Sequence, residues 1–144
     1  MGQLTLPKSG RVYIDTSSVI YSVERRPDYY PVLLPLWQAA HLGSVSIVSS
    51  ELLIMECLVG PLRSGDAVVR AAYEGLLSSE QLDLFPIDEM IFRSAANVRA
   101  TINLKTPDAI HAATALATGA AALITNDPHL ARLTGLAVQV LSHL

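Results

Sequence analysis

Four acidic residues that lie far apart in the chain have positions suited to holding a cation together: Asp15, Glu56, Asp108 and Asp127. Asp15 directly follows the apolar stretch 12–14, and Asp127 comes shortly after the apolar stretch 121–124. Asp108 lies in the first turn of an expected helix that starts with Thr106 and Pro107. Glu56 lies in an expected helix between leucine and valine residues. Because no run of lysine or arginine lies nearby, these carboxylates require a cation if they meet.

Oxygen ligands without a cysteine or a histidine pair favour a hard ion, Mg²⁺ or Mn²⁺. Such an ion can polarise a phosphodiester and lower the pKa of a water, so the chemistry indicated is metal-assisted phosphodiester hydrolysis. A plainer interpretation stays open for the three aspartates, since an aspartate in the first turn of a helix also stabilises that helix. Glu56 is harder to explain in this way, because a carboxylate among apolar residues is costly without a partner.

Several polar residues near these acids have two possible roles. Thr16 and Thr125 are candidates to orient ligand oxygens, or they are simple turn hydroxyls. His111, three positions after Asp108, is either a supporting residue of the site or a packed helix histidine, and packing is favoured. Three basic residues are candidate phosphate contacts for RNA, with surface solubility as the default: Arg25, Arg26 and Lys105.

Apolar periodicity and turn residues predict alternating strands and helices. The expected strands are 11–14, 45–48, 82–85, 121–124 and 137–141. The expected helices are 19–24, 31–41, 51–59, 64–77, 88–99, 107–118 and a short one after Asp127, with Gly60 and Pro61 ending the third. This alternation predicts an α/β fold, in which a short central parallel sheet of about four to five strands has helices on both faces. Every parallel strand would deliver its carboxyl end to the same edge, which brings the four acids together.

The composition is that of one compact domain, residues 1–144, with residues 1–10 as a loose lead-in. Hydrophobic residues make up 51% and charged residues only 16%, which favours a surface permanently covered by another chain. No apolar run is long enough to span a membrane. The single cysteine, Cys57, and the lack of a signal pattern favour the cytoplasm. The net charge of −3 argues against non-specific wrapping of duplex DNA.

Four sequence blocks resemble the PIN-domain ribonucleases. They are Tyr-Ile-Asp15-Thr-Ser, Glu-Leu-Leu-Ile-Met-Glu56-Cys-Leu-Val-Gly-Pro, Thr-Pro-Asp108-Ala-Ile-His-Ala-Ala-Thr-Ala and Leu-Ile-Thr-Asn-Asp127. The likeness covers roughly residues 11–141 and is greatest to the VapC toxins of bacterial toxin–antitoxin pairs. The resemblance implies a Mg²⁺- or Mn²⁺-dependent endoribonuclease, with metal ligands at Asp15, Glu56, Asp108 and Asp127. It also implies a toxin that inhibits translation, a homodimer and a small cognate antitoxin that blocks the site.

Two other classes of protein compete with this interpretation. A non-catalytic PIN-like module would bind RNA or protein without cutting, but such a module is expected to lack one or more of the acids, and here all four are present. A phosphatase with a nucleophilic aspartate would carry Asp-x-Asp after its first strand. Here Asp15 is followed by Thr16 and Ser17, which excludes that signature.

Overall fold

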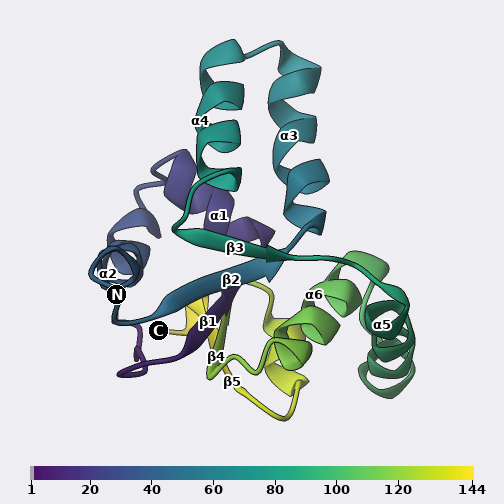
Figure 1. The fold of residues 1–144 in the computed structure, drawn as a ribbon. Helices are drawn as coiled ribbons and strands as arrows, with labels where there is room; N and C mark the ends of the chain where they lie inside the picture. The colour runs from purple at the N-terminus through teal and green to yellow at the C-terminus, as the bar shows by residue number, and fades with distance from the viewer. Residues whose placement is uncertain (1) are drawn as a thin grey trace.

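A computed structural model describes residues 2–144 and shows one five-stranded sheet (Figure 1). The strands are β1 (Arg11–Ile14), β2 (Ser46–Ser50), β3 (Leu82–Phe85), β4 (Ala122–Thr125) and β5 (Ala137–Val140). They lie in the order β3-β2-β1-β4-β5, and every neighbouring pair is parallel. The parallel α/β sheet expected from the sequence is therefore confirmed, with β1 at its centre.

Helices connect the strands and cover both faces of the sheet (Figure 1). They are α1 (Thr16–Val23), α2 (Tyr30–His41), α3 (Leu52–Ser64), α4 (Ala67–Leu77), α5 (Glu89–Ile102) and α6 (Thr106–Ala117). Two short 3-10 helices, η1 (Pro128–Arg132) and η2 (Leu141–His143), flank β5. No helix in residues 2–144 is both long enough and apolar enough to cross a membrane.

The two faces of the sheet carry separate hydrophobic cores because successive side chains of a strand point to opposite sides. On one face, Tyr13 and Leu123 pack against α5 and α6. On the other face, Val12, Ile14 and Ile124 pack against the core that includes α1, α2 and α3. The central strands β1 and β4 are therefore buried on both sides, which holds their carboxyl ends in fixed positions.

Helix α3 differs from the sequence expectation at its end. Gly60 and Pro61 were expected to break it, but the helix continues to Ser64 and stops at Gly65, whose positive φ of 74° suits glycine. A proline inside a helix costs about 3 kcal/mol. Pro61 is buried, and its packing, together with the contact between α3 and α4, offsets that cost. The next helix accordingly starts at Ala67 rather than at residue 64, with Asp66 as its cap.

Smaller differences concern strand and helix starts. Strand β2 extends to Ser50, two residues beyond the expected end, and the Ser50 hydroxyl accepts the Leu52 N–H at 3.1 Å. Helix α6 starts at Thr106, with Lys105 as the residue before its first turn. Residues 2–10 of the lead-in have no regular secondary structure, yet this segment is less loose than expected, because Thr5 and Gln139 exchange two hydrogen bonds and Leu6 packs on the core.

Helices α3 and α4 lie side by side and project from the sheet edge formed by β3, at the top of Figure 1. This arrangement leaves apolar side chains of α3 in contact with solvent. Ile54, Met55, Val59 and Leu62 are 45–63% exposed. Part of the exposed apolar surface expected from the composition therefore lies on α3, while other large apolar side chains are exposed elsewhere: Leu42, Val68, Met90 and Phe92.

Candidate functional site

The strand order reverses between β1 and β4, since the chain builds the sheet outward from β1 to β3 and then returns to the other side of β1. In open parallel sheets such a reversal leaves a crevice at the carboxyl ends of the strands. A pocket of about 200 Å³ lies there. Its lining contains the four predicted acids together with five other residues: Asp15, Glu56, Asp108, Asp127, Thr16, Ser17, Tyr21, His111 and Asn126.

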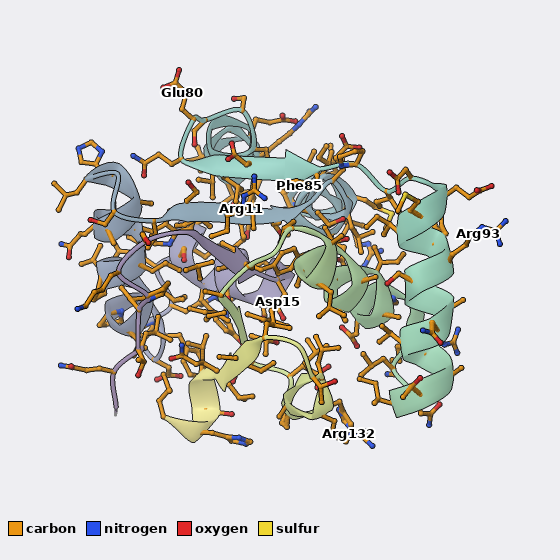
Figure 2. All side chains as sticks on the ribbon, turned by 60° about the horizontal axis from the view of Figure 1, so that its bottom comes forward. Arg11, Asp15, Glu80, Phe85, Arg93 and Arg132 are labelled. Atoms are coloured by element: carbon orange, nitrogen blue, oxygen red, sulfur yellow. The ribbon has the colours of Figure 1, made fainter. Side chains whose placement is uncertain are left out.

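Asp15 forms the floor of this pocket and is only 7% exposed. Its Oδ1 accepts hydrogen bonds from the Ser17 hydroxyl at 2.8 Å and the Ser18 N–H at 3.3 Å, and its Oδ2 accepts one from the Thr125 hydroxyl. Figure 2 shows Asp15 near the centre of the view, away from the labelled Glu80, Arg93 and Arg132. The predicted cap role of Asp15 is therefore present, since the Ser18 bond caps α1, and the same carboxylate also faces the pocket.

Asp127 is joined to Asp15 through Thr125, whose hydroxyl also accepts the Asp127 N–H at 3.0 Å. One Asp127 oxygen accepts the N–H of His129 at 2.9 Å and lies 2.9 Å from Nδ1 of the same residue. Burial alone would raise the pKa of Asp127, but the N–H and ring of His129 outweigh burial and lower it. Asp127 is thus kept ionised next to the buried Asp15.

Asp108 comes from the first turn of α6 and shares the pocket lining with Asp127. Burial raises the pKa of Asp108, and the negative charges of Asp127 and then Asp15 raise it further. A raised pKa beside two other carboxylates is the electrostatic signature of an acidic cluster that lacks a counter-charge. None of the residues lining the pocket is a lysine or an arginine.

Glu56 faces the pocket from α3, and its Oε1 has two partners. The Thr16 hydroxyl donates to it at 2.6 Å, and Nε2 of His111 lies 2.9 Å away. Burial alone would raise the pKa of Glu56, but the bonds from His111 and Thr16 outweigh burial and lower it. Glu56, whose carboxylate was expected to be costly among apolar residues, therefore has hydrogen-bond partners.

The donor set of the pocket fits a hard divalent cation, because it consists of carboxylate oxygens with hydroxyl and amide oxygens around them. Within residues 2–144, however, no three Asp, Glu, His or Cys side chains already converge into a set that would hold an ion. Asp15, Glu56 and Asp127 each have at least one carboxylate oxygen hydrogen bonded to a protein group. Binding an ion would therefore have to draw the carboxylates closer together.

Sequence reasoning did not identify three residues near the acids. Tyr13 lies behind the pocket and contacts His111, whereas Tyr21 and Asn126 line the pocket and share a hydrogen bond of 3.1 Å. Asn126 stands between Thr125 and Asp127, so its position was an available signal. Tyr13 offered no such signal in the sequence, because its partner, His111, is 98 residues away.

The structure places the other predicted candidates as follows. Thr16 lines the pocket, whereas Thr125 is fully buried behind Asp15. The three candidate phosphate contacts lie outside the pocket lining: Lys105 is exposed, Arg26 pairs with Glu24 at 3.1 Å, and the Arg25 guanidinium lies 5.7 Å from the centre of the Tyr30 ring.

Comparison with known protein families identifies the family to which this fold and pocket belong. The chain matches the PIN domain over residues 12–136 and belongs to that family. A search among curated proteins returned no match.

Solved structures agree with this assignment at the level of the fold. A chain of VapBC2 from Rickettsia felis, solved with a DNA fragment from its promoter, is 18% identical, with a TM-score of 0.71 and coverage of 90% of this chain and 98% of that one. A chain of a toxin–antitoxin complex from Klebsiella pneumoniae is 24% identical, with a TM-score of 0.69 and coverage of 90% and 97%. A chain of VapBC-5 from Mycobacterium tuberculosis is 23% identical, with a TM-score of 0.56 and coverage of 93% and 98%. The protein is thus a PIN-domain protein with a VapC-like fold.

The raised pKa of Asp108 leads to a prediction about stability. A group whose pKa is raised on folding favours the folded state below its ordinary pKa, and that advantage is lost as the pH rises through the raised value. Asp108→Asn should therefore raise the melting temperature of metal-free protein at pH 7 by a few degrees, and the gain should shrink towards acid pH. Circular dichroism melts with a chelator measure this. Asp83→Asn, at an exposed carboxylate on β3, is the control. An Asp108→Asn variant that is no more stable than wild type at pH 7 would contradict the electrostatic account.

Proposed function

We propose that this protein is a Mg²⁺- or Mn²⁺-dependent endoribonuclease and acts as the toxin of a toxin–antitoxin pair that inhibits translation. The observation that carries the proposal is the pocket at the carboxyl edge of the sheet, which four carboxylates line without a lysine or arginine among the lining residues. Membership of the PIN domain family and the likeness to chains of VapBC complexes support the same function.

In this mechanism Asp15, Glu56, Asp108 and Asp127 would hold the divalent ion. The ion, when bound, would polarise the scissile phosphodiester and favour ionisation of the attacking water. The protein's own part is to hold the carboxylates in place. Thr125 does so by donating to the carboxylate of Asp15 while accepting the backbone N–H of Asp127, so one buried hydroxyl links the two residues.

The substrate phosphate needs contacts outside the acidic pocket, because a polyanion is repelled by unneutralised carboxylates. Lys105 is exposed immediately before α6, three residues from Asp108, and we propose it as a phosphate contact. Arg25 and Arg26, in the turn after α1, remain proposed contacts further along the RNA.

The first test of this proposal is RNA cleavage. Asp108→Asn removes one ionised ligand at nearly constant volume, so the purified variant should lose cleavage by at least about 100-fold while remaining folded. Gel analysis of RNA incubated with Mg²⁺ or Mn²⁺ measures this loss.

Asp83→Asn, with an exposed carboxylate far from the pocket lining, should cut at the wild-type rate. Wild-type cleavage by pure Asp108→Asn would overturn the ligand assignment. RNA binding without cleavage by the wild-type protein would instead favour the alternative function, a non-catalytic PIN-like module.

The second test is metal-dependent stability. Mg²⁺ or Mn²⁺ at millimolar concentration should raise the melting temperature at pH 7, because a ligand that binds only the folded state stabilises it. NaCl at the same ionic strength controls for screening of surface charges. The rise should be smaller in Asp108→Asn. An equal rise with NaCl and with the divalent salts would count against a specific site.

We further propose that the protein forms a homodimer and binds a small cognate antitoxin, as chains of similar fold occur in VapBC complexes. Part of the support comes from α3, whose exposed side chains line an apolar groove of about 900 Å³ with Ile87. An apolar surface of this kind is uncommon on a protein without a partner. We assign this groove to the second copy of the chain in the homodimer.

The dimer makes a third prediction. Wild-type protein should be a dimer by light scattering at micromolar concentration, and Met55→Glu should shift it towards monomer, since it places a charge in the groove. Leu42→Glu, at an apolar residue that is 80% exposed after α2 and outside the groove lining, should leave the mass unchanged. A monomeric wild type would overturn the dimer, and a dimeric Met55→Glu would overturn the surface assigned to it.

A further inference from the structure

A buried chain of hydrogen bonds connects the core of the sheet with Glu56. The Tyr13 hydroxyl lies 2.6 Å from Nδ1 of His111, and Nε2 of His111 lies 2.9 Å from Oε1 of Glu56. Tyr13 is fully buried and His111 is 3% exposed, so the contact between them is shielded from solvent, whereas the contact with Glu56 is part-buried at the pocket. The three residues come from β1, α6 and α3, so the chain links elements on both sides of the pocket.

The partners of His111 determine which ring nitrogen carries its proton. An ionised Glu56 can only accept, so Nε2 must carry hydrogen and donate to it. Burial raises the pKa of Tyr13, so the phenol keeps its proton and can donate to Nδ1. Both contacts are satisfied when the imidazole is neutral with hydrogen on Nε2. The ring is also fixed by an edge-on contact with Tyr13, at 5.8 Å between ring centres and 72° between planes.

We propose that His111, held by Tyr13, is a positioning residue that orients the carboxylate of Glu56 for the divalent ion. This role rests on the proposed function. Both recorded bonds to Glu56, from His111 and from Thr16, fall on Oε1, which leaves Oε2 as the oxygen that can turn to a cation. Metal-binding carboxylates are commonly held by such outer hydrogen bonds, and losing one costs roughly 10- to 100-fold in metal affinity.

A purely structural histidine would not need this arrangement. The Tyr13 contact alone would satisfy one nitrogen inside the core, and the other nitrogen could bond to water at the pocket. Instead Nε2 meets both Glu56 and the Thr16 hydroxyl, at 2.9 and 3.1 Å. The result is that a side chain on α3 is tied to α6, which also carries Asp108.

Mn²⁺ affinity, measured by calorimetry at fixed pH, tests the role without relying on activity. His111→Ala should bind Mn²⁺ roughly 10- to 100-fold more weakly than wild type. His111→Gln keeps an N–H near the position of Nε2 and should stay close to wild type. Tyr13→Phe removes only the hydroxyl and should weaken binding less than His111→Ala. Tyr73→Phe is the matched control, because Tyr73 is equally buried and donates to Glu24 outside the pocket lining.

The second readout is the tautomer of His111 in metal-free protein, measured by nitrogen NMR. A role in folding alone would not fix this tautomer. Protonated Nε2 with bare Nδ1 is expected, and the opposite tautomer would overturn the role. Wild-type affinity in folded His111→Ala would also overturn it. If His111→Ala does not fold, Tyr13→Phe provides the test, because it removes only a hydroxyl and leaves no comparable cavity. An unchanged Mn²⁺ affinity in Tyr13→Phe would then overturn the positioning role of His111.

The same titrations separate this inference from the function on which it rests. If Asp108→Asn loses Mn²⁺ binding while His111→Ala keeps it, only the positioning role is wrong. If wild-type protein itself does not bind Mn²⁺, the proposed metal-dependent function is wrong, and the positioning role falls with it.

Discussion

Mutual repulsion between carboxylates at the carboxyl edge of the sheet is the constraint on which this structure depends. Asp127 and Asp15 lie close enough to Asp108 for their charges to raise its pKa, and the pocket lining includes no lysine or arginine. Groups of like charge do not gather without a scaffold that holds them. Here the scaffold is the parallel pairing of β1 with β4, whose strands are buried on both faces and release their chains side by side.

The partners that the protein supplies to these carboxylates are mostly neutral. Hydroxyl groups of Ser17 and Thr125 donate to Asp15, while Asp127 accepts the backbone N–H of His129 and also contacts the ring of that residue. Such donors satisfy lone pairs and fix side-chain orientation, but they do not cancel the charge. The pocket therefore keeps a negative potential that favours the binding of a cation from solvent. An arginine in the same place would have stabilised the cluster and closed it to a cation.

The sequence predicts most of this arrangement, because the aspartates lie next to local signals. Asp15 directly follows β1 and Asp127 comes two residues after β4, and the parallel topology then brings them together. Two features depend on tertiary contacts and escaped prediction. The continuation of α3 through Pro61 depends on packing against α4, which outweighs a strong local helix breaker. The contact between Tyr13 and His111 joins residues that are 98 positions apart, and no local sequence pattern around either residue indicates it.

The packing of α6 explains how such a costly site is tolerated. Repulsion involving Asp108 lowers the stability of the metal-free fold at neutral pH, so the remaining structure must supply the difference. Helix α6 does this with a nearly continuous buried run from Ala109 to Ala115, whose small side chains pack closely against the sheet. A helix anchored along its length can keep its first turn, and Asp108 with it, facing two other carboxylates. The packing of α6 thus stabilises the fold behind the site, and the unfavourable repulsion lies at the edge of the sheet, where a bound cation would relieve it.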